Sequence, residues 1–335
     1  MKKMSRALAL VAAFGTVAAF ATGCSASGTG GGSTAGTQYD VAFVVGAASD
    51  PFFQAMKVGA DKEAKDLGVK LQFQGDATTY SPSTQIPIVN QALATSPNAL
   101  IIGPTDPTAL QPVVDRAAAT MPVVNVDTSV GNLDKVLSFI TGDNEDGGAK
   151  AADAIAKGIG YQDGKSYTVA VGLSSATSTT NVARLTGFEA QLKKKYPGIT
   201  VVATAYSESN PAKANTNVNN WLTAYPDLAG IFAIDGTNAT GAAAALQAKG
   251  LVGKVALVGY DAYKANVDLL KQGVFTALIA QDPAQMGKLA VQAVVEKLKN
   301  SDAKVKHQQT LPNIILDKNT SADDLAKYTY VESAG

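Results

Sequence analysis

The amino-acid sequence predicts an α/β protein of two lobes, each built on a parallel sheet with helices on both faces. Residues 38–335 are enough for two domains of ordinary size. Within them, short apolar runs of strand length alternate with helical periods. This alternation occurs in both halves of the chain, so we expect two sheets, one in each half.

The elements of the first half follow from their apolar periodicity. The first strand covers 41–45 and the first helix 53–67, where apolar side chains recur on one helical face. The alternating Val69, Leu71 and Phe73 predict the next strand. The unit then repeats as a strand at 100–102, a helix over 107–119 and a strand at 123–126.

The second half repeats the pattern. Its expected strands lie at 169–173, 201–202, 231–234 and 255–258. Its expected helices lie at 182–195, 212–224 and 239–248. Strands that are separated by helices form parallel sheets, so both sheets are expected to be parallel.

Polar turns rich in carboxylates and amides follow the predicted strands. They occupy 47–51, 103–107, 127–129, 142–144, 235–237 and Asp261. In open α/β sheets, ligands bind outside the carboxyl ends of the strands. Six polar turns at those ends, drawn from both halves, predict one ligand cleft between the lobes.

The residue types present exclude several kinds of chemistry. The only histidine, His307, lies in a charged segment near the C-terminus, so a serine–histidine nucleophile is not expected. With a single cysteine, the chain can form neither a zinc site of Cys and His ligands nor an intrachain disulfide. No glycine-rich phosphate loop follows the first strand, and the acidic stretch 143–147 lacks the ligand spacing of an EF-hand. We therefore predict no metal, no cofactor and no catalytic residue.

The charge balance gives no reason to expect nucleic acid as a partner. Without the basic residues Lys2, Lys3 and Arg6 of the leader, 25 basic and 28 acidic residues remain, a net charge of about −3. A chain of that charge has no electrostatic attraction to phosphate backbones.

Aspartates in the polar turns are the main candidates for the site. These are Asp50, Asp127, Asp235 and Asp261. A pair of them could hydrolyse a glycoside, but we favour hydrogen bonding to ligand hydroxyls. Arg184 would donate in a planar fork, and Gln281 and Asn144 offer both donors and acceptors. Four or five charged hydrogen bonds of about 1.5–3 kcal/mol each give a micromolar complex, so the set predicts a polyhydroxylated ligand.

The first 37 residues differ in composition from the rest. A basic start precedes an apolar run over 7–21 and a string of small residues, which predicts a secretory signal peptide over 1–23. Residues 24–37 are rich in Gly and Ser and predict a flexible tether. The cysteine at the cleavage point resembles the lipobox of bacterial lipoproteins. The resemblance implies that Cys24 is acylated and anchors the protein outside the cytoplasm to the cell membrane.

Eight motifs in order resemble the type I periplasmic binding proteins of ABC importers for simple sugars, the ribose- and galactose-binding group. The first is the opening strand and turn, which carries Asp50, Phe52 and Phe53. The others lie at 102–106, 122–127, 141–148, 184–188, 231–235, 258–261 and 279–283. The match runs over the whole chain that follows the tether.

The resemblance implies a fold and a mechanism. Two Rossmann-like lobes would be joined by a hinge of three chain crossings. The first lobe would comprise 38–142 plus 282–312, and the second 143–281 plus 313–331. Ligand would bind between the lobes and close them, and a monomer would present the closed form to a permease in the membrane.

The resemblance also implies which residues hold the ligand. They are Asp50, Phe52, Phe53, Asp127, Asn144, Arg184, Asp235, Asp261 and Gln281. One of the two phenylalanines would stack on the sugar while the other packs. Gly103 and Asp235 stand where the ribose binders have asparagine, so the resemblance does not imply ribose itself.

Two other functions share these features. A receptor could present a furanosyl signal or a sugar to a membrane sensor, and an extracellular glycosidase could use the carboxylates. A sugar-responsive repressor is excluded, because a signal and tether stand where its DNA-binding helices would be.

Overall fold

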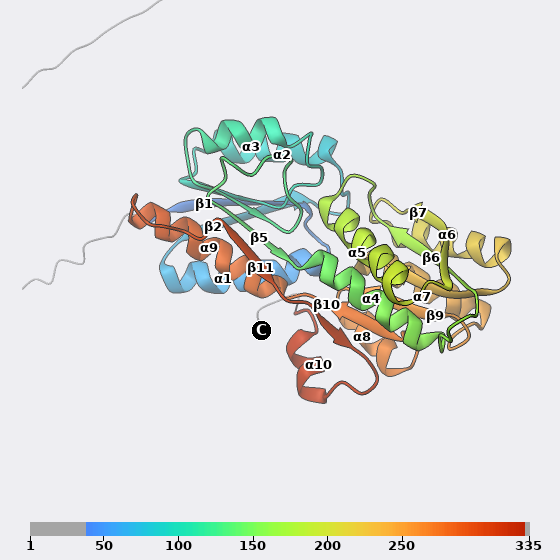
Figure 1. Ribbon diagram of the computed structural model, residues 1–335. Coiled ribbons are helices and arrows are strands. Elements are labelled where there is room, and N and C mark those ends of the chain that lie inside the picture. The colour runs from blue at the N-terminus through green and yellow to red at the C-terminus, as the bar shows by residue number, and fades with distance from the viewer. Residues whose placement is uncertain (1–37, 332–335) are drawn as a thin grey trace, which may run out of the picture. The chain divides into compact units, whose positions relative to one another are not determined.

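The structure, a computed structural model, describes residues 38–331 and contains two six-stranded sheets with helices on both faces (Figure 1). The predicted fold class, α/β with two lobes, is confirmed. The predicted signal peptide at 1–23, the tether at 24–37 and Cys24 lie outside the described residues. No helix within 38–331 is long and apolar enough to cross a bilayer.

The first sheet has the strand order β11-β5-β4-β3-β1-β2, and every neighbouring pair is parallel. Its strands are β1 (Asp40–Ala47), β2 (Lys70–Asp76), β3 (Ala99–Ile102), β4 (Val123–Val126), β5 (Ser138–Gly142) and β11 (Gln308–Leu311). Its helices are α1 (Pro51–Leu67), α2 (Pro82–Ala94), α3 (Gln111–Ala118) and α9 (Pro283–Lys299). These elements form lobe 1.

Alternate residues of β1 belong to different core clusters. Phe43 packs in the cluster that includes Met56 of α1, whereas Val44 packs with Val89 of α2 and Val113 of α3. Because successive side chains of a strand point to opposite faces, both faces of this sheet are covered by helices.

The second sheet has the order β12-β10-β9-β8-β6-β7. Its strands are β6 (Tyr167–Leu173), β7 (Ile199–Tyr206), β8 (Leu228–Ala233), β9 (Ala256–Tyr260), β10 (Ala277–Ala280) and β12 (Ile314–Leu316). Its helices are α4 (Asn144–Gly158), α5 (Thr179–Lys195), α6 (Pro211–Ala224), α7 (Gly236–Lys249), α8 (Lys264–Lys271) and α10 (Ala322–Tyr328). These elements form lobe 2.

One pairing in lobe 2 differs from the parallel arrangement expected from the sequence. The edge strand β12 runs antiparallel to β10, while the other pairs are parallel. The chain reaches β12 directly from β11 of the other sheet, so no helix intervenes to return it in the parallel direction.

The chain passes between the two sheets three times. It leaves lobe 1 between β5 and α4, and returns between β10 and α9. It passes back to lobe 2 between β11 and β12, at residues 312–313. Asn313, in the third crossing, is hydrogen-bonded to the first: its Nδ2 donates to the backbone oxygen of Asp143 at 2.6 Å.

Helix starts differ from the prediction where aspartates bind nearby backbone groups. α1 begins at Pro51 rather than 53, since Asp50 caps it by accepting from the Phe52 N–H. α3 begins at Gln111 rather than 107, because Asp106 accepts from the N–H groups of Thr108 and Ala109 and holds a turn there.

A close glycine contact joins two helices in each lobe. In lobe 1, a Cβ at Gly59 of α1 would lie 1.9 Å from the Ala284 backbone oxygen of α9. In lobe 2, a Cβ at Gly148 of α4 would lie 1.9 Å from the Arg184 backbone oxygen of α5. Only glycine allows the helix backbones to approach this closely.

Candidate ligand-binding site

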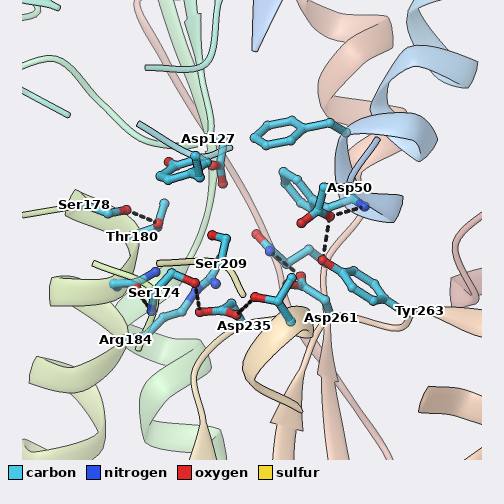
Figure 2. A pocket seen from close by; sticks show the side chains of 16 residues that line it. Asp50, Asp127, Ser174, Ser178, Thr180, Arg184, Ser209, Asp235, Asp261 and Tyr263 are labelled. Carbon is cyan, nitrogen blue, oxygen red and sulfur yellow. Dashed lines mark hydrogen bonds between the residues drawn. The ribbon is translucent and has the colours of Figure 1, made fainter. Parts of the chain in front are cut away.

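A cavity of about 50 Å³ lies where the carboxyl ends of the strands of both lobes meet. Its lining residues are Asp50, Phe52, Phe53, Tyr80, Asp127, Ser174, Ser178, Thr180, Asn181, Arg184, Ser209, Asp235, Thr237, Asp261, Tyr263 and Gln281. In Figure 2, Asp50 and Asp127 face the cavity from one side and Asp235 and Asp261 from the other. One water molecule needs about 10–15 Å³, so the cavity has room for a few water molecules or for polar groups of a compact ligand.

Eight of the nine residues predicted to bind ligand line this cavity; the ninth, Asn144, does not. The Asn144 side chain instead accepts from Nε of Arg184 at 2.8 Å, and its amide donates to the Gly142 backbone oxygen. The structure therefore places Asn144 behind Arg184, where it orients the guanidinium.

Asp127 and Asp261 occupy equivalent places in the two lobes. Each follows the last residue of a strand, β4 and β9, and each has a positive φ, 61° and 67°. Each N–H donates at 2.8 Å to the neighbouring strand, to Ile140 and Ile279 respectively. Non-glycine residues rarely adopt this conformation, and strained backbone of this kind concentrates at functional sites.

Asp261 is held by three donors. Its Oδ1 accepts from Gln281 Nε2 at 2.8 Å and from the Tyr330 hydroxyl at 2.9 Å, and its Oδ2 accepts from the Gly236 N–H at 3.1 Å. Burial raises the pKa of Asp261, whereas the charge of Arg184 and these side-chain hydrogen bonds lower it.

Arg184 of α5 is 3% exposed and provides the positive charge of the cavity lining. Its Nη1 donates to the Ile234 backbone oxygen at 3.0 Å, and its guanidinium lies 3.8 Å from the centre of the Tyr260 ring. Burial alone would lower the pKa of Arg184, but the carboxylates and Tyr260 around it raise the pKa. Its charge in turn opposes the effect of burial on Asp127, whose pKa burial raises to about 6.

Asp50 forms a hydrogen bond across the cavity. The Tyr263 hydroxyl of lobe 2 donates to Asp50 Oδ1 at 2.5 Å, and the Phe52 N–H donates to the same oxygen. Burial raises the pKa of Asp50 to about 7, although both hydrogen bonds lower it. Because both donors use Oδ1, Oδ2 of Asp50 is left for a ligand.

The two phenylalanines after Asp50 are both buried and both line the cavity. Their rings meet edge to face with centres 5.2 Å apart. An aromatic wall of this kind packs well against the C–H groups of a sugar ring.

Asp235 lines the cavity, yet its oxygens are largely used within the protein. Oδ1 accepts from the Asn238 N–H and the Thr237 hydroxyl, and Oδ2 accepts from Ser174 Oγ and Asn238 Nδ2. With these four donors, the main effect of Asp235 is to orient the hydroxyls of Thr237 and Ser174.

Several lining residues were not predicted from the sequence: Tyr80, Ser174, Ser178, Thr180, Asn181, Ser209, Thr237 and Tyr263. The hydroxyl-rich stretch 174–180 directly after β6 is a polar turn of the kind that signalled the others. Tyr80 and Tyr263 carry no comparable signal, because single tyrosines in connecting segments are common.

The same hydroxyl-rich stretch contacts lobe 1 directly. Thr177 donates to Asp106 at 2.8 Å, and Thr179 accepts from the Ser129 N–H at 2.9 Å. Ser178 lies 3.2 Å from Thr128, oxygen to oxygen. The lobes are thus joined by hydrogen bonds at the rim of the cavity as well as inside it.

The residues suited to metal binding do not gather. Within 38–331, no group of three or more His, Cys, Asp or Glu side chains could hold a metal ion.

The fold and the site together define a two-lobed binding protein for a small polar ligand, and comparisons with known proteins agree. A family model described as a periplasmic binding protein domain matches residues 41–302. The ribose import binding protein of Salmonella typhimurium is 31% identical over 276 residues, 82% of this chain and 90% of that protein. The chain belongs to the periplasmic binding protein family.

Solved structures give the same result. An ABC transporter solute-binding protein from Agrobacterium vitis, bound with α-D-tagatopyranose, matches with a TM-score of 0.82 at 30% identity, covering 88% of this chain and 100% of that chain. A carbohydrate transporter solute-binding protein from Agrobacterium radiobacter, in complex with D-arabinose, matches with a TM-score of 0.83 at 29% identity, covering 88% and 99%. These relatives are binding proteins of transporters and not enzymes, which agrees with the prediction.

Proposed function

We propose that this protein captures a monosaccharide or a related polyol between its lobes outside the cytoplasm and delivers it to an ABC permease. One observation carries the proposal: a single cavity is lined by carboxylates, by Arg184 and by two phenylalanines that come from both lobes. Buried charged groups need partners, and the hydroxyl groups of a sugar can both donate and accept hydrogen bonds.

The other lining groups complement such a ligand. Asp50, Asp127 and Asp261 accept from hydroxyls, the remaining N–H groups of Arg184 donate to them, and the two phenylalanines cover the apolar face of the ring. Both lobes contribute to this set, so a sugar held by it binds the closed form better than an open one and draws the lobes together.

Calorimetric titration of residues 38–335 with D-ribose, D-allose, D-arabinose, D-tagatose and D-galactose tests the proposal. We expect micromolar or tighter binding of at least one sugar, with one sugar per chain. Failure of all five, and of simple polyols, would contradict it. Release of the chromophore from nitrophenyl glycosides would favour the glycosidase instead, and a membrane sensor kinase encoded beside the gene, with no permease, would favour the receptor for a furanosyl signal.

The raised pKa values of Asp50 and Asp127 predict opposite effects of pH on stability and on binding. An aspartate whose pKa is about 7 or 6 in the folded protein, against an ordinary 3.8, binds protons more tightly when folded. Its contribution to the free energy of unfolding is therefore complete below about pH 4 and is lost as the pH rises to 7. A sugar that donates to the ionised carboxylates shows the opposite dependence: its affinity falls as the pH is lowered from 7 to about 4, because the carboxylates become protonated.

Thermal denaturation and calorimetry between pH 5 and pH 8 check this prediction. The sugar-free protein is expected to melt at a lower temperature as the pH rises, and sugar binding near pH 6 is expected to release protons to the buffer. Asp50→Asn is the matched control, because it keeps the shape of the side chain and removes the titration. A pH dependence that is the same in Asp50→Asn and in the unmodified protein would contradict the assignment.

Lipid attachment at Cys24 is the remaining part of the proposal. Cys24→Ser is expected to move the full-length protein from the membrane fraction to the soluble extracytoplasmic fraction. It is expected to leave sugar affinity unchanged, because every cavity residue lies at Asp50 or later in the chain. Fractionation with antibody detection measures the first effect and titration the second. Retention of the Ser variant at the membrane would show that another feature holds the protein there.

A further inference from the structure

The segment after α10 reaches the ligand cavity from behind. No residue of α10 itself is buried, yet Tyr330, two residues beyond it, is 5% exposed. The Tyr330 N–H donates to the Ala262 backbone oxygen at 2.9 Å, which fixes the segment beside the turn that follows β9.

Tyr330 completes a closed set of hydrogen bonds with two residues of the cavity. Its hydroxyl donates to Asp261 Oδ1 at 2.9 Å and accepts from the Gln281 N–H at 3.4 Å. Gln281 Nε2 donates to the same Asp261 oxygen at 2.8 Å. Asp261 and Gln281 line the cavity, whereas Tyr330 does not.

The Tyr330 ring also supports an aromatic residue from each lobe. Its centre lies 6.1 Å from that of Phe52 in lobe 1 and 6.0 Å from that of Tyr263 in lobe 2. Both of those residues line the cavity, and Tyr263 is the donor to Asp50. One side chain near the C-terminus thus contacts four lining residues.

We propose that Tyr330 is a positioning residue for the ligand site: without touching the ligand, it orients the Asp261 carboxylate and Gln281 so that they meet the sugar hydroxyls. This inference rests on the proposed function. Asp261 Oδ1 already has two donors within the protein, which directs the free acceptor capacity of the carboxylate to Oδ2. Losing the tyrosine hydroxyl leaves Asp261 held only by Gln281 and the Gly236 N–H, so the carboxylate is fixed less firmly in that orientation.

Tyr330→Phe is expected to shift the pKa of Asp261, which a purely structural role of Tyr330 would not do. The Tyr330 hydrogen bond lowers the pKa of Asp261 against the effect of burial. Removal of this hydrogen bond should therefore raise the pKa of Asp261 further. Asp261 then takes up a proton at a higher pH than in the unmodified protein, and sugar binding is lost at that higher pH. The charged and titratable groups that face Asp261 stay in place and act equally on both forms: Arg184, Asp127, Asp235, Asp50, Tyr260 and Tyr263.

The test compares Tyr330→Phe with Tyr328→Phe in the chain from residue 38 to 335. Tyr328 is a matched control, because it lies in the same segment, is partly buried, and its hydroxyl makes no hydrogen bond within residues 38–331. The probe is whichever of D-ribose, D-allose, D-arabinose and D-tagatose binds the unmodified protein most tightly. We expect Tyr330→Phe to weaken binding of this sugar about 10-fold. When affinity is measured against pH, the loss of affinity on acidification should begin at a higher pH in Tyr330→Phe. Tyr328→Phe should change neither.

A second measurement is independent of any sugar. The carboxyl carbon of Asp261, assigned with Asp261→Asn, is titrated by NMR in the sugar-free protein, and its pKa should be higher in Tyr330→Phe. If the unmodified protein binds none of the sugars, the proposed function fails and this titration alone decides whether Tyr330 controls Asp261. An unchanged Asp261 titration, or unchanged sugar affinity in Tyr330→Phe, would overturn the inference.

Discussion

Replacement of Arg184 by alanine is expected to weaken sugar binding about 30-fold or more, equivalent to about 2 kcal/mol, while the protein stays folded. The guanidinium is buried among Asp127, Asp261 and Asp235 and is held by Asn144 and Ile234. Its removal deletes the charged donor that we propose for the ligand and leaves carboxylates without their counter-charge. The pKa of Asp127 and that of Asp261 then rise, because the Arg184 charge lowers both.

The variant is measured by calorimetric titration over pH 5 to 8 and by urea denaturation. Besides the weaker binding, we expect the free energy of unfolding of Arg184→Ala to fall by about 3 kcal/mol, the usual cost of breaking a buried charge pair. Arg116→Ala is the control, since Arg116 lies on the exposed surface of α3 and donates to Pro112 and Asn90. Arg184→Lys should restore the charge but not the planar fork, and so recover binding only in part. Equal sugar affinity in Arg184→Ala and the unmodified protein would remove Arg184 from the site.

Gly148→Ala is expected to destabilise the protein by about 2 kcal/mol and also to weaken sugar binding. The new Cβ would lie 1.9 Å from the Arg184 backbone oxygen, and backbone cannot rotate away as a side chain can. Overpacking costs roughly 1–3 kcal/mol or more, against about 1 kcal/mol gained from the helix propensity of alanine. The helices α4 and α5 must separate, and Arg184 moves with α5.

Gly198→Ala provides the comparison, because its Cβ would meet the Lys165 backbone oxygen at 2.1 Å in lobe 2, and neither residue lies in a helix that carries a cavity residue. Both variants should lose similar stability in urea, but only Gly148→Ala displaces the helix that carries Arg184. Its loss of sugar affinity should therefore be the larger. Unchanged stability of Gly148→Ala, or an equal loss of sugar affinity in the two variants, would contradict this expectation.

The sequence predicts most of the fold because the central strands are buried on both faces and are visible in the sequence as short apolar runs. It fails where local chemistry or length weakens that signal. The helix α2 was not anticipated, since it contains Pro87 and buries only Gln85, Val89 and Ala92. The strand β12 has three residues and no helix before it, so no periodicity marks it.

The sequence predicts those site residues that come directly after the strands. Asp127 and Asp261 were predicted on that ground and line the cavity, whereas Asn144, also after a strand, turns back to Gly142 and Arg184. Tyr330 could not be predicted, because 69 positions separate it from Asp261 and no motif links them. Contacts of that kind depend on how the completed lobes pack.

The pairing of α1 with α9 has a consequence for synthesis of the chain. Strands β1 to β5 emerge first, but α9, which packs against α1 and over β3, β4 and β5, follows only after residue 282, and β11 later still. Lobe 2, by contrast, takes its five parallel strands and helices α4 to α8 from one continuous stretch, 144–280. Because domains fold as their segments leave the ribosome, the apolar face around Ile101 and Val124 stays open to chaperones while lobe 2 assembles. Lobe 1 is thus synthesised first, but its sheet is covered by α9 only after the helices α4 to α8 of lobe 2 have been made.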